Sequence, residues 1–492
     1  MSEDKNPPLS EEVEFDAVDL EKQPKRVRKA EAKPPTRKKS TPAKKTFSKV
    51  EKNIARGTKK KLLPLPFEVA KKKPFKGRKM VKPDFKGIEK KDTRKRDFSR
   101  KPTFNPEMTE KACSGKEGPF LLQVFQAATI DPHFTQGFHH YPGRIPLQMA
   151  KLLLEHFGQK GRLFDPFMGS GTILLEGLLA GMQVAGNDLN PIASVITRER
   201  CRWLSLRNAR RVWTEVEELR QGIEKENLGK HRVHHLHAES LQNLYPPHLL
   251  VEMLHWMERI NQLPDPAVRE SLRAVFSSLI YRFTPEEDAV RRQSRVGRGQ
   301  FGRAMGERTK ELIEAQTELS DHIRLIDNPQ LSQEDILKLE YDPPLEADLI
   351  LTRPPFPGNG KQMLSQKLLL KWLNLPIKPF EEGQLGIGTD LQKKNWTPRF
   401  RKLMLNLRRA SVPGGRCVML FEDWLDRGKK VDALNFVRRF SGSEGWKMTA
   451  SASRPLQNFS RGEEDFGRTG KQKADAESKI AFEMVEPADQ TL

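Results

Sequence analysis

The stretch DPFMGSGT, residues 165–172, joins an apolar segment to a helix-forming one, and it decides the fold of this chain. Residues 162–167 favour a short buried strand, and residues 172–180 favour a helix. Between them, Gly169 and Gly171 allow the backbone to come close to a ligand, with the N-terminus of the helix behind it. We therefore expect a ligand-binding turn between the first strand and its helix.

An acidic residue follows this turn at the spacing of a nucleotide-binding fold. Residues 183–187 favour a second strand, Asp188 comes directly after it, and Pro191 is placed to open the next helix. A carboxylate at that strand end can accept hydrogen bonds from both hydroxyls of a ribose. The glycines match neither the GxGxxG pattern nor the phosphate loop GxxxxGK, so the prediction depends on the turn and Asp188 together.

Further along the chain in both directions, the pattern is that of a parallel, doubly wound α/β domain. Residues 145–157 keep helical spacing before the first strand. More strands are predicted at 347–351, 416–421, 447–451 and 479–484. Between the two sets, residues 205–330 interrupt the sheet pattern with helices predicted around 208–227, 247–261, 267–283 and 304–325, and with a short strand at 233–237.

Charge divides the chain into an arm and a body. The whole chain carries 87 Lys and Arg against 65 Asp and Glu, and residues 21–100 alone carry 31 basic and eight acidic side chains. Such composition cannot bury enough apolar surface to offset chain entropy. We expect a disordered arm that neutralises phosphates, with aromatic side chains available to stack on bases. These aromatic residues are Phe67, Phe75, Phe85 and Phe98. The alternative is a generic solubilising tail.

These patterns predict four segments. The basic arm covers residues 1–115, and the first part of the α/β domain covers 116–205. A helical insertion that recognises the substrate covers 206–330, and the second part of the α/β domain covers 331–486.

The remaining composition points to a soluble protein of the cytoplasm. Three cysteines, Cys113, Cys201 and Cys417, lie far apart and without metal-ligand spacing, which argues against a disulfide framework. No apolar run approaches the ~20 residues that span a bilayer. The first residues, MSEDKNPPLSEEVEFD, are acidic and lack the apolar core of a secretory signal.

Two motifs together resemble a known family. Residues 167–171, FMGSG, resemble the FxGxG motif of S-adenosylmethionine-dependent methyltransferases, and more narrowly of the amino-methyltransferases that modify exocyclic nitrogens of nucleic-acid bases. The second hallmark of that family is Asp, Asn or Ser followed by two prolines and an aromatic residue after the fourth strand. Residues 347–358, ADLILTRPPFPG, supply the two prolines and the aromatic residue.

The resemblance extends beyond these motifs and covers roughly residues 120–485. Residues 138–146, FHHYPGRIP, are similar to the segment that closes over the methionine moiety, and Asp335 matches the acidic position that contacts the adenine of the cofactor. The insertion resembles a bacterial subgroup of DNA-methylase-like proteins. The resemblance implies a Rossmann-like class I methyltransferase sheet that uses S-adenosylmethionine. The cofactor-binding residues that it implies are Asp165, Phe167, Gly169, Gly171, Thr172, Asp188 and Asp335.

The catalytic loop implied by the resemblance is Arg353, Pro354, Pro355 and Phe356. In the family, the polar side chain and a proline carbonyl accept the hydrogens of the amine, and the aromatic ring stacks on the flipped base. Here Phe356 can stack and the Pro354 carbonyl can accept, but Arg353 has donors only. If Arg353 turns outward, the carbonyl of Thr352 or Pro354 can replace the missing acceptor. If it turns inward, its charge meets the positive sulfonium of the cofactor.

Two other clusters bear on function. The Arg-rich segment around 291–303 is typical of a region that becomes ordered on nucleic acid, although a solvated loop is the simpler alternative. Its residues are Arg291, Arg292, Arg295, Arg298 and Arg303. The histidines His231, His234, His235 and His237 have strand-like alternation with no Cys or acidic ligand nearby, so we expect no metal site there.

The leading hypothesis is an enzyme that transfers a methyl group from S-adenosylmethionine to an exocyclic amino nitrogen of a base in DNA or RNA. One alternative, motivated by Arg353, is a non-catalytic nucleic-acid-binding protein on a degenerate methyltransferase scaffold. Another is a methyltransferase that acts on an amide nitrogen of a protein. The expected partner is nucleic acid, with no membrane and no metal.

Overall fold

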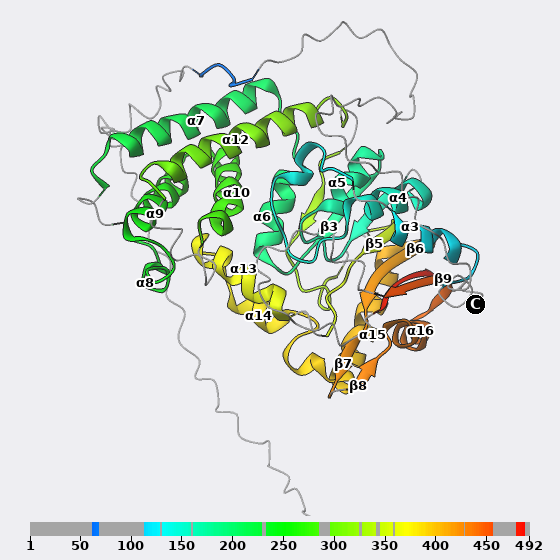
Figure 1. The fold of residues 1–492 in the computed structure, drawn as a ribbon. Coiled ribbons are helices and arrows are strands. Elements are labelled where there is room, and N and C mark those ends of the chain that lie inside the picture. Colours follow the sequence, from blue (N-terminus) through cyan, green and yellow to red (C-terminus); the bar gives the residue numbers. More distant parts are fainter. Residues whose placement is uncertain are drawn as a thin grey trace, which may run out of the picture. The chain divides into compact units, whose positions relative to one another are not determined.

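The structure is a computed structural model, and it describes part of the chain. The described residues are 62–67, 113–127, 130–158, 161–228, 233–284, 296–323, 327–340, 345–357, 360–427, 429–455 and 479–487, with the backbone alone at 360–365, 454–455 and 479–487. Most of the expected basic arm, together with His231, Arg291, Arg292 and Arg295, lies outside them. All described residues belong to one compact unit, and the ribbon is shown in Figure 1.

An eight-stranded sheet lies at the centre of the described part, and five neighbouring strands of it pair in parallel. The order across the sheet is β1 (Cys113–Ser114), β9 (Trp446–Pro455), β10 (Lys479–Pro487), β6 (Ser411–Glu422), β5 (Ala347–Thr352), β2 (Arg162–Asp165), β3 (Gln183–Asn187) and β4 (Gln330–Ser332). β10 pairs antiparallel with both β6 and β9. The predicted α/β sheet is confirmed, and each strand predicted from the first and last parts of the sequence is present.

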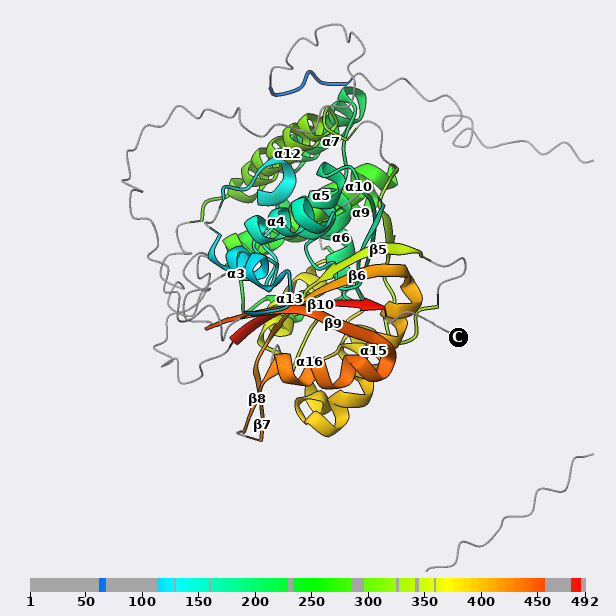
Figure 2. The same cartoon turned by 90° about the vertical axis from the view of Figure 1, so that its right-hand side faces the viewer.

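Helices cover both faces of the sheet because successive strand residues point to opposite sides. On one face, α3 (Gly118–Gln126), α4 (Leu147–Phe157) and α5 (Thr172–Leu179) pack on side chains such as Leu349, Leu351 and Leu420. On the other face, α15 (Lys393–Ala410) and α16 (Ala433–Ser441) pack on the alternate residues, including Ile350, Met419 and Phe421. Figure 2 shows these two helical layers with the strands between them.

A small two-stranded hairpin leaves the sheet after β6. It consists of β7 (Trp424–Asp426) and β8 (Lys429–Val431), which pair antiparallel. Arg427 adopts a left-handed backbone conformation with φ of 50° between the two strands.

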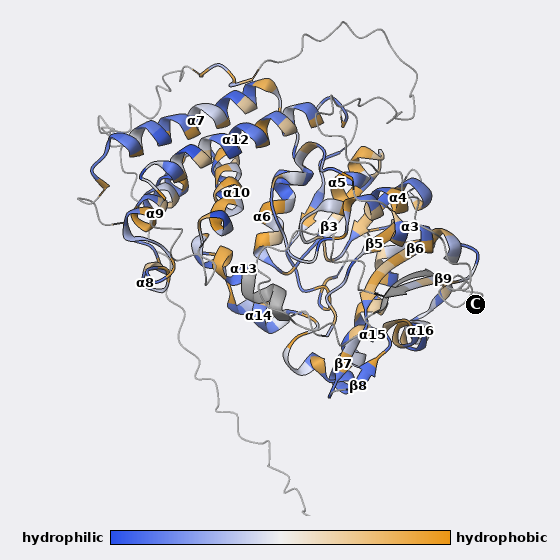
Figure 3. Ribbon diagram, viewed as in Figure 1, coloured by the Kyte–Doolittle hydropathy of each residue, from blue (hydrophilic) through white to orange (hydrophobic). Residues whose placement is uncertain are grey.

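The predicted insertion consists mainly of helices in its described residues. Its helices are α7 (Leu206–Lys225), α8 (Ala238–Leu241), α9 (Pro247–Gln262), α10 (Pro266–Phe283) and α12 (Gln300–Leu319). They share one apolar core with α6 (Pro191–Arg200) and α13 (Gly360–Trp372). In Figure 3, α7 and α12 are largely blue, which marks hydrophilic residues, with apolar residues at intervals along each helix.

The strand predicted at 233–237 is wrong, because the described residues 233–237 lead through a turn into α8. His235 is buried there and its Nε2 lies 3.1 Å from the Trp372 carbonyl oxygen. His235 therefore packs against α13. Burial lowers the pKa of His235, which favours the neutral ring.

The insertion matters for the site because it supports α13 and α14 (Lys378–Gly383), which follow the catalytic loop in sequence. The Trp372 indole is fully buried, and its N–H donates to the Tyr245 hydroxyl at 3.0 Å. The Trp372 ring also packs against Phe276 of α10, with centroids 5.4 Å apart. Phe380 of α14 belongs to the same core.

Residues 62–67 lie within the range expected to be a disordered arm, yet they pack on this helical layer. The Leu63 N–H donates to the Thr214 hydroxyl of α7 at 2.8 Å. Leu65 and Phe67 contact the apolar core of the insertion. Phe67 is therefore part of the packed structure and is not an aromatic side chain available for bases.

Within the described residues, no helix has the length and apolar content that crossing a membrane requires.

Glu252 of α9 supports the start of α12 and offers a stability test. Its buried carboxylate accepts the Gly299 and Gly302 N–H groups at 2.9 Å each, and first-turn amides have no partner within their own helix. We predict that Glu252→Gln lowers the free energy of unfolding in urea by about 1–3 kcal/mol, because one acceptor becomes a donor. Glu258→Gln, at a partly exposed position of the same helix, should change it by less than about 0.5 kcal/mol. Equal losses would contradict this role.

Candidate cofactor and catalytic site

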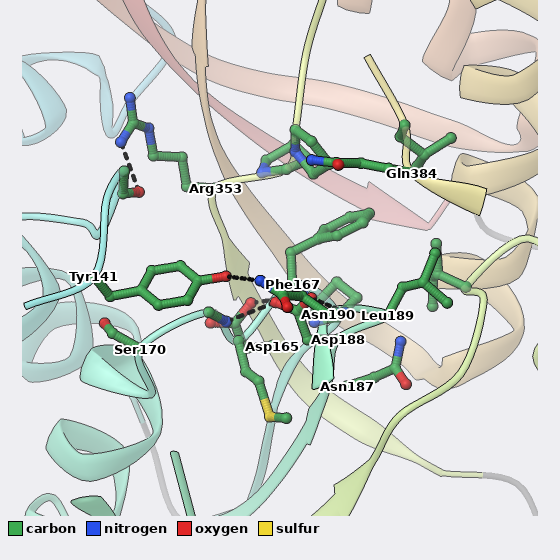
Figure 4. A pocket seen from close by; sticks show the side chains of 18 of the residues that line it. Tyr141, Asp165, Phe167, Ser170, Asn187, Asp188, Leu189, Asn190, Arg353 and Gln384 are labelled. Carbon is green, nitrogen blue, oxygen red and sulfur yellow. Dashed lines mark hydrogen bonds between the residues drawn. The ribbon is translucent and has the colours of Figure 1, made fainter. Parts of the chain in front are cut away.

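Most of the predicted residues of the two motifs line one pocket at the carboxyl edge of the parallel strands, where ligands of doubly wound sheets bind. Gly171 is buried and does not line it. Asp165 is the last residue of β2, Asp188 comes directly after β3, and Asp335 comes three residues after β4. Arg353 and Pro354 come directly after β5. Residues 141–145 and 383–385 complete the wall. Figure 4 shows this pocket from close by.

The glycine turn has the backbone conformation that its sequence predicts. Gly169 has φ of 47° and Gly171 has φ of 75°, both in the left-handed region that favours glycine. A Cβ atom on Gly171 would lie 2.8 Å from the Thr197 side chain, so no larger residue fits there without movement. The Thr197 hydroxyl also donates to the Gly169 carbonyl at 3.0 Å, which fixes the turn against α6.

Asp188 connects the glycine turn to the second strand. One carboxylate oxygen accepts the Gly169 N–H at 2.9 Å, and the other accepts the Asn190 N–H at 2.8 Å. Loss of solvation raises the pKa of Asp188 to about 6. The residue remains partly exposed towards the pocket, and each carboxylate oxygen has a further lone pair for a ligand.

Asn187, which the sequence analysis did not single out, positions the acidic loop after β4. Its side chain is buried and binds the Glu334 backbone from both sides, accepting from the N–H and donating to the carbonyl at 3.0 Å each. Glu334 precedes Asp335, whose Oδ1 accepts the Leu337 N–H at 3.0 Å. The strand-end asparagine thus fixes where Asp335 meets the pocket.

A buried polar network holds the segment at 138–146 against the same strand end. The Asn190 amide caps α6 by accepting the Ile192 N–H, and its NH₂ group donates to the Tyr141 hydroxyl at 3.1 Å and to Gln366. Burial raises the pKa of Tyr141 well above its usual range, so the phenol stays neutral. The local sequence could indicate only the cap, because Tyr141 and Gln366 come from distant elements.

Arg200 is a second residue that sequence reasoning missed. It is fully buried at the end of α6, and its guanidinium donates to the Ser170 carbonyl at 2.6 Å and to the His139 carbonyl at 2.8 Å. Among the described residues, no carboxylate forms an ion pair with it. Burial lowers its pKa to about 9, which still leaves it charged at neutral pH. Arg200 therefore ties the glycine turn to the segment at 138–146.

Asp165 joins the glycine turn to the catalytic loop. Its carboxyl group is 2% exposed and accepts the Thr352 hydroxyl at 2.7 Å and the Phe167 N–H at 3.1 Å. Burial raises its pKa to about 7, an effect that these two hydrogen bonds only partly oppose. Asp165 thus links the carboxyl ends of the neighbouring strands β2 and β5.

Arg353 turns away from the carboxylates of the pocket. Its guanidinium donates to the Gly143 carbonyl at 2.7 Å and forms an ion pair with Glu422 at the end of β6. In Figure 4 its head group points towards that carbonyl and away from Asp188 and Phe167. The positive charge is therefore balanced by Glu422 and lies outside the space between the acidic residues.

The rest of the catalytic loop divides between pocket and core. Pro354 and Pro355 line the pocket, as expected. Phe356 is 4% exposed and packs in the core with Leu385 and Trp396, so in this conformation its ring is not open to a base. Phe167 is the partly exposed aromatic residue of the pocket wall. Thr172 and Ser170 also line the pocket.

The other predicted clusters lie elsewhere. Arg298 and Arg303 are exposed at the start of α12 and are not among the residues that line this pocket. Among the described residues, no group of three or more His, Cys, Asp or Glu side chains is arranged to hold a metal ion.

A mostly parallel, doubly wound sheet with a glycine turn, an acidic residue at the next strand end and a Pro-Pro-aromatic loop after β5 defines the class I methyltransferase architecture. The motif pair resembles that of amino-methyltransferases. The two curated relatives described next agree with this resemblance.

Two curated methyltransferases match a short stretch of the chain. The Type II methyltransferase M.MvaI of Kocuria varians is 39% identical over 74 residues, which are 14% of this chain and 16% of that protein. The tRNA (guanine(10)-N2)-dimethyltransferase of Methanothermobacter thermautotrophicus is 35% identical over 78 residues, which are 14% of this chain and 23% of that protein. The chain thus spans less than a quarter of either relative. No protein-family model matches the chain.

Solved structures of methyltransferases also align, but only loosely. TrmN from Thermus thermophilus aligns over 70% of this chain and 50% of its own, with 12% identity and a TM-score of 0.27. The rRNA methyltransferase aviRa from Streptomyces viridochromogenes aligns over 70% and 88%, also with 12% identity and a TM-score of 0.27. Because these scores are low, the fold assignment depends on the strand order and the site.

The raised pKa of Asp165 predicts a pH dependence of stability. Between about pH 4 and pH 7 the folded chain keeps a proton on Asp165 that the unfolded chain has lost, so the contribution of Asp165 to stability falls as pH rises through this window. Asp165→Asn cannot titrate. The difference in unfolding free energy, wild type minus variant, should therefore fall from pH 4 to pH 7 and level off above, measured by urea denaturation at each pH. A difference that rises over this range would show that Asp165 is stabilised as a carboxylate.

Proposed function

We propose that this protein transfers a methyl group from S-adenosylmethionine to an exocyclic amino nitrogen of a base in DNA or RNA. The observation that carries the proposal is the position of Arg353. This residue replaces the usual polar acceptor of the catalytic loop, yet its guanidinium is held by Gly143 and Glu422 away from the acidic half of the pocket.

The residues of the pocket fit the proposed cofactor. S-adenosylmethionine, when bound, supplies a methyl group on a positively charged sulfonium. Asp188 offers carboxylate lone pairs to ribose hydroxyls, and Asp335 stands at the neighbouring strand end for the adenine. Gly169 lines the pocket, and a Cβ atom there would lie 3.1 Å from the Tyr141 ring, so glycine keeps this part of the pocket open.

In our proposal, the catalytic loop activates the exocyclic amine of the base. An exocyclic amine is a weak nucleophile because its lone pair is delocalised into the ring. A carbonyl that accepts one of its hydrogens favours the tetrahedral geometry in which the lone pair is available. The Pro354 carbonyl takes this role in our proposal, because Pro354 lines the pocket, whereas Thr352 is fully buried and does not, and the Arg353 side chain has no acceptor. Phe167 is the aromatic wall against which a planar base can lie.

The direct test is transfer of a radiolabelled methyl group to separate DNA, RNA and protein fractions from cells that lack the gene. Labelling of a nucleic-acid fraction, followed by identification of the methylated base, is the expected result. Labelling of protein alone would favour amide methylation. No labelling of any fraction, despite tight cofactor binding, would favour a non-catalytic scaffold.

Asp188 provides a test of the cofactor site. We predict that Asp188→Ala weakens binding of S-adenosylmethionine by about 1–3 kcal/mol in calorimetry, the scale of hydrogen bonds to a charged group. Wild-type affinity should also fall as pH is lowered through about 6, because protonation removes the carboxylate that accepts the hydroxyls. Glu340→Ala, at an exposed position that does not line the pocket, is the control and should leave the affinity within a factor of about two. If Asp188→Ala bound S-adenosylmethionine as tightly as wild type, the cofactor would bind at another place.

Arg353 provides a test of the catalytic loop. Because its guanidinium faces Gly143 and Glu422, we predict that Arg353→Ser keeps methyl transfer or raises it, and at most weakens nucleic-acid affinity. The measurement is the transfer rate at saturating substrate beside the Kd for the same oligonucleotide. Arg353→Ser combined with Glu422→Gln separates loss of the arginine from exposure of an unpaired carboxylate. Loss of transfer in both variants, with cofactor affinity intact, would make the guanidinium itself part of the reaction.

A further inference from the structure

The β7–β8 hairpin follows the end of β6, which contacts the catalytic loop. Glu422, which pairs with Arg353 of the catalytic loop, lies two residues before β7. The Lys393 N–H at the start of α15 donates to Asp426 of the hairpin at 3.2 Å, and Arg427 donates to Gln392 at 3.2 Å. Arg399 of α15 in turn donates to the Gly383 carbonyl of the pocket wall at 3.0 Å.

The base of the hairpin is firmly packed. Trp424 is 5% exposed, and its ring packs edge-on against Phe436 of α16 with centroids 5.0 Å apart. The Asp423 carboxylate accepts the Ala433 N–H at 2.9 Å and pairs with Lys430 at 3.3 Å. The outer residues of the hairpin are therefore held in place by a rigid root.

The outer residues combine exposed apolar surface with positive charge. Leu425 is 56% exposed and Leu391, just before α15, is 43% exposed; both are unusual for leucine in this structure. Around them, Lys394, Arg427 and Lys429 are exposed. α15 itself carries seven basic residues and no acidic one.

This combination argues against an ordinary solvated face. Single exposed leucines are ordinary on protein surfaces, but Leu391 and Leu425 lie among cations on two segments that hydrogen bonds join, and exposed apolar side chains grouped in this way mark interaction sites. Cations bind phosphates without regard to sequence, and apolar side chains contact sugars and base edges. The charge sign and the position beside the proposed substrate pocket both fit a polyanion with apolar rings.

We propose that Leu391, Lys394, Leu425, Arg427 and Lys429, here called the basic hairpin surface, hold the nucleic acid beside the pocket. The cations bind backbone phosphates, and Leu425 lies against a sugar or base next to the nucleotide that enters the pocket. This inference rests on the proposed function in that it takes nucleic acid as the substrate, and it adds the place where the substrate is held.

The test uses the full chain and two fluorescent probes, a short DNA duplex and an RNA hairpin, with Kd measured by anisotropy over a series of salt concentrations. Each phosphate contact contributes a slope of about −0.9 in log affinity against log salt on duplex DNA. The double substitution Lys394→Gln and Lys429→Gln should therefore make the slope shallower by up to about 1.8 on the duplex. Cofactor affinity should stay unchanged, because neither lysine lines the pocket.

Matched controls separate the effect of the basic hairpin surface from the effect of removing any two positive charges. Lys116, just after β1, and Lys447, in β9, are exposed and lie outside the basic hairpin surface, and the double change Lys116→Gln and Lys447→Gln should leave the slope as in wild type. Leu425→Ser should weaken binding several-fold with an unchanged slope, because it removes an apolar contact and no charge. Leu236→Ser, at a leucine 72% exposed in the insertion, should not weaken binding.

The possible failures are distinguishable. If wild type binds neither probe, the proposed nucleic-acid substrate fails. If wild type binds a probe, and the hairpin variants keep its affinity and slope, only the basic hairpin surface is overturned. Polyglutamate, a polyanion without bases, should compete weakly. If it competes as well as an unlabelled oligonucleotide of equal charge, an acidic protein becomes the better partner for this surface and the inference is overturned.

Discussion

A buried hydrogen bond between Thr352 and Asp165, 2.7 Å long, joins the two halves of the site across the adjacent carboxyl ends of β5 and β2. Asp165 starts the glycine turn, and Thr352 leads directly into the catalytic loop. The contact therefore sets the position of the proposed cofactor pocket relative to the loop that would hold the base. A buried carboxyl group without partners would be costly, so the two strand ends stabilise each other only when both loops are in place.

The environment of Arg353 shows how the catalytic loop accommodates a side chain with donors only, at a position where the family has a hydrogen-bond acceptor. Glu422, from the next strand of the sheet, balances the charge, and the Gly143 carbonyl directs the head group towards the segment that closes the pocket. The arginine thus connects three loops. Arg200, which is buried, also connects loops: it donates to a carbonyl oxygen of the glycine turn and to one of the segment at 138–146. Two guanidinium groups, one at the rim and one buried, hold the loops that surround the pocket.

Much of the fold could be predicted because its signals are local. The β2 strand, the glycine turn and α5 follow from eight consecutive residues and their flanks, and the helices of the insertion follow from apolar spacing. α15 was missed although Trp396, Phe400, Leu403 and Leu407 repeat at helical intervals, because its seven basic residues resemble a charged loop. The hairpin was missed because each of its strands has only three residues, too few for a period to be visible.

By itself, the sequence determined the parallel sheet, the glycine turn and the acidic residue Asp188 at the end of the second strand, since these depend on short-range geometry and on the rule that parallel strands share a carboxyl edge. Only the tertiary structure decided the direction of Arg353, the burial of Phe356, and the partners of Asn187, Asn190 and Arg200. Each of these depends on contacts between residues dozens to hundreds of positions apart. The energy of a buried polar group or ring is set by the neighbours that the fold brings to it, and not by those beside it in the chain.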